Sequence, residues 1–292
     1  MSSKQKQSYM FAALAILSWS TVSTAFKFSL VHFSPIGLLL ISSSTACIFL
    51  GLYVLISTKD PFADFLQNLS SSILPGFLNP FLYYMVLFIA YDRLRAQEAQ
   101  ALNYTWAIVL SLLSVLLLKE RFRIRDLVAL IVSLFGVVII STKGQILRIR
   151  FDDGFGTALA LGSSLIWAAY WILNLKDKRP NPIKLFYNFL IGFILIGATA
   201  GIFRSQILLP DANKLTALTG GIWVGIFEMG LTFILWLKAL QLTENTAKIS
   251  NMIFITPFIS MIFISSILGE SIHPATLAGL VLIVGSNILQ KS

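Results

Sequence analysis

The chain of 292 residues is 57% hydrophobic and only 12% charged, and its mean hydropathy is +0.82. Soluble domains average about 45–50% apolar and about 25% charged residues, so this composition excludes an ordinary soluble domain and indicates an integral membrane protein. The net charge of +9 does not suggest a nucleic-acid partner, because the basic residues lie mostly in short gaps between apolar runs, where they orient membrane spans. The expected surroundings are a lipid bilayer.

Cysteine and histidine are too rare for redox or metal chemistry. Cys47 is the single cysteine, so no intramolecular disulfide can form. The two histidines, His32 and His273, lie near segment ends and are too few for a metal site, and no cofactor is expected. The first residues imitate a secretory signal, with two lysines, an apolar stretch and small residues at 23–25. Similar apolar stretches follow along the whole chain, so we interpret this one as a retained first helix.

Ten apolar segments follow one another with short gaps. A helix that crosses a bilayer needs about 20 residues, which most of these runs approach or exceed. The sequence therefore predicts an all-α integral membrane fold of ten transmembrane helices. The expected segments are 9–31, 35–57, 70–91, 96–118, 126–141, 154–175, 182–203, 215–240, 246–268 and 274–289.

The basic residues predict the orientation. With the N-terminus in the cytoplasm, fourteen Lys and Arg fall on the inside and eight on the outside. We expect a multi-pass protein of the cell (inner) membrane with both termini cytoplasmic.

Spacing suggests an internal repeat. Trp19 and Trp167 stand 148 positions apart, and Glu120 and Glu270 stand 150 apart. We predict an N-terminal five-helix repeat at 1–150 and a C-terminal one at 151–292, within one membrane domain. Because five is odd, the two repeats would be inserted in opposite directions, which places a substrate site near the midplane. The alternative is that ten-helix membrane proteins in general look weakly self-similar.

Glu228 is the most informative single residue. It lies in the middle of segment 215–240, where a carboxylate facing lipid would be costly. It is a candidate for proton coupling or for contact with a substrate ammonium, and the alternative is a structural hydrogen bond between helices. Lys27, at the end of the first segment, faces either the pore or the lipid headgroups.

Amide and aromatic side chains recur at depths where lipid contact is unfavourable. Asn79 and Tyr83 share one helical face, as do Asn103 and Trp106, and Asn251 lies inside the ninth segment. Trp167 is central in the sixth segment, with Trp171 one turn further on and Trp19 at the matching place in the first. Together they predict a largely apolar cavity with a few polar groups, although core packing remains open for each.

The order of several residues resembles a known family. A Trp followed by Lys in the first helix is present as Trp19 and Lys27, and the proline of the ninth helix is Pro257. Glutamates that close the fourth and ninth helices are Glu120 and Glu270. The chain thus resembles the EamA-type transporters of the drug/metabolite transporter superfamily over its whole length. The resemblance implies ten helices in two inverted halves, cytoplasmic termini and a central cavity.

The run Leu-Asn-Tyr-Thr-Trp at 102–106 is similar to the amino-acid exporter branch of that superfamily. This resemblance implies that aromatic residues of the third, fourth and sixth helices line the cavity. The implied lining is Tyr83, Tyr84, Tyr104, Trp106 and Trp167. Ala107 stands where the first-half proline of the family would be.

We therefore expect an exporter of small organic solutes, amino acids or related metabolites, that works by alternating access. Uptake or exchange of a nucleotide-like or quaternary-amine solute is the alternative within transport. An embedded enzyme or a structural membrane partner is the alternative from another class, and the enzyme lacks the HExxH or GxSxG motifs it would need. A small-molecule substrate is the expected partner and a monomer the expected assembly. The expected substrate-binding residues are Trp19, Asn79, Tyr83, Tyr84, Asn103, Tyr104, Trp106, Trp167, Trp171, Glu228 and Asn251.

Overall fold

The computed structural model describes residues 2–60, 62–118, 124–145, 153–202, 214–244, 249 and 252–291. Within these ranges, eight helices are long and apolar enough to cross a membrane, and two shorter apolar helices follow at Ile253–Leu268 and Pro274–Leu289. The predicted all-helical membrane fold is confirmed. The expected repeat boundary at 150 and 151, together with Glu120 and Asn251, lies outside the described residues.

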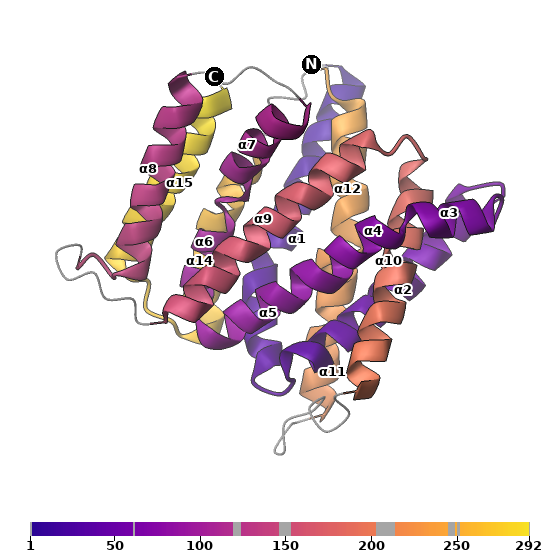
Figure 1. Ribbon diagram of the computed structural model, residues 1–292, viewed down its shortest axis with the longest axis horizontal. Coiled ribbons are helices and arrows are strands. Elements are labelled where there is room, and N and C mark those ends of the chain that lie inside the picture. Colours follow the sequence, from indigo (N-terminus) through magenta and orange to yellow (C-terminus); the bar gives the residue numbers. More distant parts are fainter. Residues whose placement is uncertain are drawn as a thin grey trace.

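The first half contains five spans, of which the third and fourth are assembled from shorter pieces. The third consists of α4, the π-helical turn η1 and α5, and the fourth consists of α6 and α7 (Figure 1). The elements are α1 (Ser3–Leu30), α2 (Pro35–Ser57), α3 (Phe65–Ser71), α4 (Ile73–Gly76), η1 (Phe77–Leu82), α5 (Tyr83–Arg93), α6 (Ala96–Asn103), α7 (Trp106–Leu118) and α8 (Ile124–Ser141).

The second half repeats this plan. Its third span consists of α11, the π-helical turn η3 and α12, and its fourth contains a short 3₁₀ turn, η4, before α14. The elements are α9 (Gly154–Lys176), α10 (Asn181–Ile202), α11 (Lys214–Trp223), η3 (Val224–Glu228), α12 (Leu231–Leu242), η4 (Ile253–Ile255), α14 (Thr256–Leu268) and α15 (Pro274–Lys291).

Side-chain caps define several helix starts. The hydroxyl of Ser2 accepts a hydrogen bond from the backbone N–H of Gln5, so α1 begins six residues before the expected segment. Ser34 caps α2, which has Pro35 in its first turn, and Asp153 caps α9. Gly269, with a φ of +67°, adopts the left-handed conformation that ends α14.

The helix interruptions fall at matching places in the two halves. Asn79 leaves helical geometry inside η1, with φ −146° and ψ 118°, and η3 ends at Glu228 in the corresponding span. The fourth span is interrupted between Asn103 and Trp106, and the 3₁₀ turn at Ile253–Ile255 follows 150 positions later. Discontinuous spans at corresponding positions of two repeats are typical of a substrate site.

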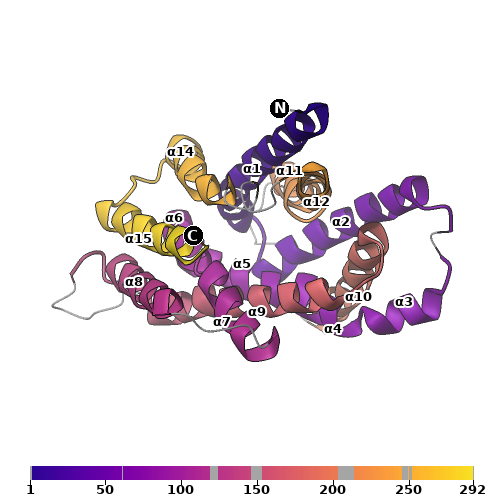
Figure 2. The ribbon, with the colours of Figure 1, turned by 90° about the horizontal axis from the view of Figure 1, so that it is seen from above.

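Two helix groups, each drawn from both halves, form the centre of the molecule. Helix α1 packs against α11, α12 and α14, which we call the α1 bundle, and α9 packs against α5, α6 and α7, which we call the α9 bundle. Figure 2 shows the two bundles facing each other across the middle of the molecule. Exchanging each helix for its counterpart in the other half leaves this packing pattern unchanged.

The remaining helices pair across the halves in the same way. Helix α2 packs against α10, and α8 packs against α15. The second pair approaches closely at Gly136 and Gly279, since a Cβ on Gly279 would lie 2.6 Å from the carbonyl oxygen of Gly136. Both chain ends lie at the same edge of the bundle (Figure 1), so α1 leads away from that edge and α9 leads back towards it. We call that edge the termini side and the other the opposite side.

Candidate functional site

A cavity of about 300 Å³ lies between the α1 bundle and the α9 bundle. The α1 bundle contributes aromatic, aliphatic and hydroxyl side chains and one carboxylate. The α9 bundle contributes mainly rings and amides. The lining includes Trp19, Ser23, Phe26, Glu228, Trp236 and Thr256 from the first bundle, and Tyr83, Tyr91, Gln100, Asn103, Tyr104, Trp106, Trp167 and Trp171 from the second.

Most of the expected binding residues reach this cavity. Those that line it are Trp19, Tyr83, Asn103, Tyr104, Trp106, Trp167, Trp171 and Glu228. Tyr84 lies behind the wall, where its hydroxyl donates to Glu228.

Asn79 is not brought to the cavity. Its side chain is fully buried beside the hydroxyl of Tyr170 and the amide of Asn188, because the non-helical backbone at Asn79 breaks the helical face that it was expected to share with Tyr83. Asn251 lies outside the described residues.

Glu228 connects the two bundles near the middle of the cavity. The Oε1 atom of Glu228 accepts a hydrogen bond from the hydroxyl of Tyr84 at 3.0 Å, and Glu228 is 8% exposed. Among the described residues that line the cavity, Glu228 is the only Asp, Glu, Lys, Arg or His. Any solute in the cavity therefore meets one acidic group and no basic one among those residues.

Rings provide most of the remaining surface. Five of the chain's six tryptophans line the cavity. Trp167 stacks on Tyr83, with ring centroids 4.6 Å apart, and Trp19 contacts Trp236 at 5.6 Å across the α1 bundle. Such a concentration of rings in one apolar chamber suits a flat or cationic solute.

Side-chain hydrogen bonds hold the interruption of the fourth span in place. The amide of Asn103 donates to the hydroxyl of Ser163 at 2.9 Å, and the hydroxyls of Thr105 and Ser164 lie 3.0 Å apart. Both partners lie on α9, so the interrupted turn is fixed to the neighbouring helix. This arrangement keeps Tyr104 and Trp106 facing the cavity.

Lys27 lies at the end of the cavity on the opposite side. Its ammonium donates to the carbonyl oxygens of Tyr91 at 2.6 Å and Leu94 at 2.7 Å, at the C-terminus of α5. A cation at that position satisfies carbonyls that the helix leaves unpaired. Ser23 and Tyr91 add a hydroxyl contact of 2.7 Å between the same two helices. Lys27 therefore seals the cavity here, a role that neither alternative from the sequence describes.

Glu270 caps the next helix on the same side. Its carboxylate accepts from the backbone N–H of Ala96 at 3.0 Å, at the start of α6, where negative charge is favourable. The side chain of Gln97 donates to the carbonyl oxygen of Ser271 and accepts from the N–H of His273 at 2.8 Å. These contacts tie the end of α14 to the start of α6. We call Ser23, Lys27, Tyr91, Gln97 and Glu270 the opposite-side network.

The lining residues differ in exposure between the two ends of the cavity. Leu175, which lines it near the end of α9, is 65% exposed. Phe26, Tyr91 and Gln100, at the other end, are between 2% and 4% exposed. The cavity lining thus reaches the molecular surface near the termini side and is buried on the opposite side.

Sequence reasoning missed several lining residues, namely Ser23, Phe26, Tyr91, Gln100, Trp236 and Thr256. Two of them had a usable pattern. Trp236 follows Glu228 by eight residues and Gln100 precedes Asn103 by three, so each lies close to the same helical face as a predicted residue.

An all-helical membrane fold with a central cavity that is closed at one end is typical of multi-pass membrane transporters. Residues 6–142 and 154–289 each match the EamA-like transporter family, and the chain belongs to that family. It is a transporter and not an enzyme. Its two EamA halves together contain the helices of both bundles.

Known relatives support this placement without naming a substrate. The chain is 28% identical over 207 residues to an uncharacterized transporter of Clostridium kluyveri, a match that covers 68% of this chain and 64% of that protein. It is 22% identical over 278 residues to an uncharacterized transporter of Archaeoglobus fulgidus, covering 93% and 94% of the two chains. A solved structure titled "Crystal structure of protein" shares the fold, with a TM-score of 0.65, 18% identity, and 97% and 96% of the chains covered.

Proposed function

We propose that this protein exports small organic solutes that combine an apolar body with a protonated amine, amino acids and related metabolites among them, by alternating access. The observation that supports this most is the composition of the cavity. Five tryptophans surround it, and Glu228 is the only charged side chain among its described lining residues. A carboxylate in an apolar chamber attracts an ammonium group, and the rings can enclose the remainder of the solute.

The sequence-based alternatives differ in how well they suit this cavity. A nucleotide-like solute carries phosphates, which are usually bound by Arg, Lys or helix N-termini, and no basic side chain lies among the described lining residues. A quaternary amine suits the rings but cannot donate a hydrogen bond to Glu228. It is therefore the second candidate, favoured by the cluster of Trp19, Trp167 and Trp236.

We propose that transport alternates by rocking the α1 bundle against the α9 bundle. The contacts that would have to break are those of the opposite-side network, which cross from one bundle to the other. A single chain contains both bundles, so a monomer suffices as the transport unit. The charge asymmetry of the loops supports cytoplasmic termini, and the accessible end of the cavity then faces the cytoplasm.

The tryptophans supply a direct binding assay. Because five of the six line the cavity, a solute that enters should change their fluorescence. Purified protein would be titrated with phenylalanine, phenethylamine, choline and a nucleoside monophosphate. We expect the amines and the amino acid to produce a saturable change and the nucleotide to produce none. A response to the nucleotide alone, or to no member of the set, would contradict the proposal.

Two tryptophan variants make this assay specific. Trp223 is 42% exposed and is not among the lining residues, so Trp223→Phe should preserve the change. Trp167→Phe should remove much of it. Counterflow of the responding solutes in proteoliposomes then tests whether binding leads to transport.

A further inference from the structure

A second cavity, of about 720 Å³, lies where four membrane spans end. Helix α2 ends at Ser57, α4 begins at Ile73, α9 ends at Lys176 and α10 begins at Asn181. The lining comes from the segment that links α2 to α4 and from the turn that links α9 to α10. This cavity therefore lies at the depth of the lipid headgroups, and the helix directions place it on the termini side. We call it the headgroup-level pocket.

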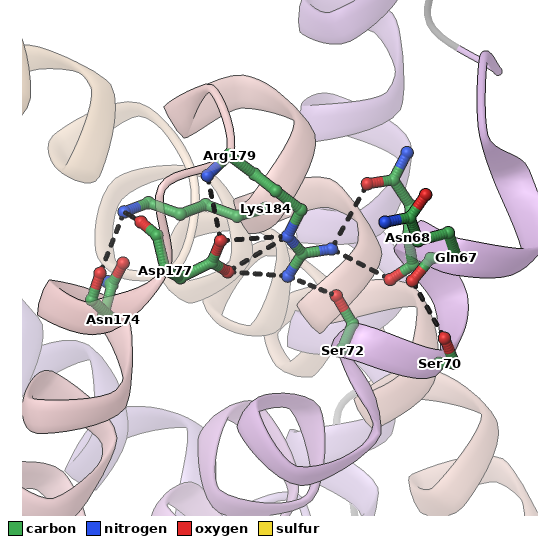
Figure 3. Close-up of polar contacts among 8 residues, drawn as sticks. All are labelled: Gln67, Asn68, Ser70, Ser72, Asn174, Asp177, Arg179 and Lys184. Atoms are coloured by element: carbon green, nitrogen blue, oxygen red, sulfur yellow. Dashed lines mark hydrogen bonds and ion pairs between the residues drawn. The ribbon is translucent and has the colours of Figure 1, made fainter.

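One wall of the pocket is fixed by Arg179. Its guanidinium donates to both carboxylate oxygens of Asp177, to the carbonyl oxygen of Asn68 at 2.9 Å and to the hydroxyl of Ser72 at 3.0 Å (Figure 3). Burial raises the pKa of Asp177, but the bonds from Arg179 outweigh this effect and hold that pKa below its usual value. Arg179 is therefore fully occupied and serves as a wall that joins the α9–α10 turn to the start of the third span.

Lys184, behind this wall, is also engaged. Its ammonium donates to the carbonyl oxygen of Asn174 at 3.1 Å, at the end of α9 (Figure 3). Because Arg179 and Lys184 are already bound to groups of the protein, an occupant of the pocket would be bound by other charged side chains.

Four exposed charges line the pocket. Lys176 and Lys178 lie at the end of α9 and in the turn that follows it. Asp60 and Asp64 lie in the segment between α2 and α3. In the part of the chain that the structure describes, no hydrogen bond or ion pair of these four side chains is found. Two positive and two negative groups therefore face one space at the membrane surface.

The pocket also has an apolar border. Leu74, Pro75, Leu173 and Ile183 line it on the side of the spans. Nearby on α3, Leu66 is 78% exposed and Phe65 is 42% exposed. Apolar side chains at this depth are suited to contact with acyl chains. The pocket thus combines charges of both signs with a surface that continues into the bilayer.

We propose that the headgroup-level pocket binds a zwitterionic aminophospholipid of the phosphatidylethanolamine type. The phosphate faces Lys176 and Lys178, the primary ammonium donates to Asp60 and Asp64, and the acyl chains run past Leu74 and Leu173. A choline headgroup lacks the N–H donors that the aspartates accept from. An anionic headgroup such as phosphatidylglycerol leaves both aspartates without a cationic partner.

The test is lipid retention by the full-length protein, measured by native mass spectrometry. Detergent-purified protein would be mixed with equal amounts of phosphatidylethanolamine, phosphatidylcholine and phosphatidylglycerol of identical chains. We expect retention of phosphatidylethanolamine about fivefold above either competitor, as a surface ammonium–carboxylate contact allows. Equal retention of all three, or preference for phosphatidylglycerol, would overturn the proposal. Displacement of the lipid by soluble glycerophosphoethanolamine at the same concentration would show a soluble occupant and would overturn it as well.

Variants locate the effect in the pocket. Asp60→Asn combined with Asp64→Asn should abolish the preference over phosphatidylcholine, and Lys176→Gln combined with Lys178→Gln should reduce retention of every phospholipid. Lys4→Gln with Lys6→Gln removes the same charge from the same membrane face outside the pocket, and should change nothing. An equal loss in the control pair would show a general surface-charge effect instead of a site. Protein yield and melting temperature distinguish loss of the site from loss of the fold.

Discussion

The two ends of the central cavity are held by different kinds of contact. On the opposite side, hydrogen bonds cross between bundles, from Lys27 to α5 and from Glu270 to α6. On the termini side, the hydrogen bonds of Ser8 with the carbonyl of Ala239 and of Gln5 with the N–H of Glu244 join α1 to the end of α12, within one bundle.

This difference indicates which contacts must change during transport. Contacts inside a bundle can persist while the two bundles move against each other. Contacts between bundles hold one end shut and have to be exchanged for others when that end opens. The opposite-side network should therefore set the balance between the two access states. The hydrogen bonds of Ser8 and Gln5 should not affect that balance.

The largest effect of a substitution is expected on solute binding, at Glu228, which lies between the two ends of the cavity. Glu228→Gln keeps the shape and a hydrogen bond with Tyr84 but removes the charge that faces a bound ammonium. A hydrogen-bonded charge contact contributes about 1.5–3 kcal/mol, so binding of phenethylamine should weaken by about 10- to 150-fold. Tryptophan fluorescence titration measures this.

The same variant tests the proposed coupling to protons. If Glu228 exchanges a proton during the cycle, Glu228→Gln should flatten the dependence of proteoliposome flux on pH. Unchanged affinity together with an unchanged pH profile would remove Glu228 from both roles. Tyr84→Phe is the matched comparison, because it keeps the ring and the carboxyl group of Glu228 while it deletes the donor hydroxyl.

The second largest effect is expected on the closure of the cavity at its opposite-side end. Lys27→Met removes three hydrogen bonds from an ammonium to carbonyls, one of them long, so the closed state should lose about 1–2 kcal/mol relative to the open one. In a Cys47→Ser background, a Val22→Cys reporter in the cavity should then react about 5- to 30-fold faster with an impermeant thiol reagent added from the opposite side. Lys238→Met, whose ammonium lies over the Phe11 ring within the α1 bundle, should not change that rate. Equal rates in all three proteins would show that Lys27 does not hold the cavity shut.

A smaller effect of the same sign is expected at Gln97. Gln97→Leu removes the side-chain contacts with Ser271 and His273 and a long one with the Glu270 carboxylate, but it leaves the hydrogen bond from the N–H of Ala96 to Glu270. The labelling rate of the same reporter should rise about three- to fivefold, as expected for about 1 kcal/mol. A rise as large as that in Lys27→Met would place the main contact at Gln97 instead.

The smallest effect is expected at Asp153, which lies on the opposite side but acts within the α9 bundle. The backbone N–H of Gly156 and the side chain of Arg93 at 2.9 Å hold the pKa of Asp153 below its usual value. Since the folded state lowers this pKa, the stabilisation is complete above the unfolded value of about 3.9 and is lost as pH falls through the folded value. Asp153→Asn should therefore lower the melting temperature by about 1–2 °C at pH 7, and the difference should begin to shrink below about pH 4 and vanish once the pH is below the folded pKa. The labelling rate of the Val22→Cys reporter should stay the same, and a large increase would contradict the assignment to one bundle.

The sequence predicted the spans because length and apolarity alone define them. It could not predict the interruptions in full. Pro80 lies inside η1 and Pro257 in the first turn of α14, whereas the interruption after Asn103 contains no proline and depends on hydroxyls of α9. Periodicity also assigned Asn79 to the face of Tyr83, which fails because the backbone at Asn79 is not helical.

The site was partly predictable for a similar reason. Mid-membrane Glu228, Asn103 and Trp167 reach the cavity, as expected from the cost of exposing them to lipid. Lys27 and Gln97 act through backbone groups of helices that are far away in the sequence, and local spacing gives no information about such partners. Which helices face each other, α1 with α12 and α9 with α5, follows only from the three-dimensional packing.

Two distances measured in one experiment test the rocking of the bundles most directly. Spin labels at Leu175 and Leu240 report the termini-side end of the cavity, and labels at Val31 and Arg95 report the opposite end. On addition of a solute that binds, electron–electron resonance should show the first distance shorten while the second lengthens. Two distances that stay fixed, or that change in the same direction, would contradict a transporter in which the α1 and α9 bundles open one end by closing the other.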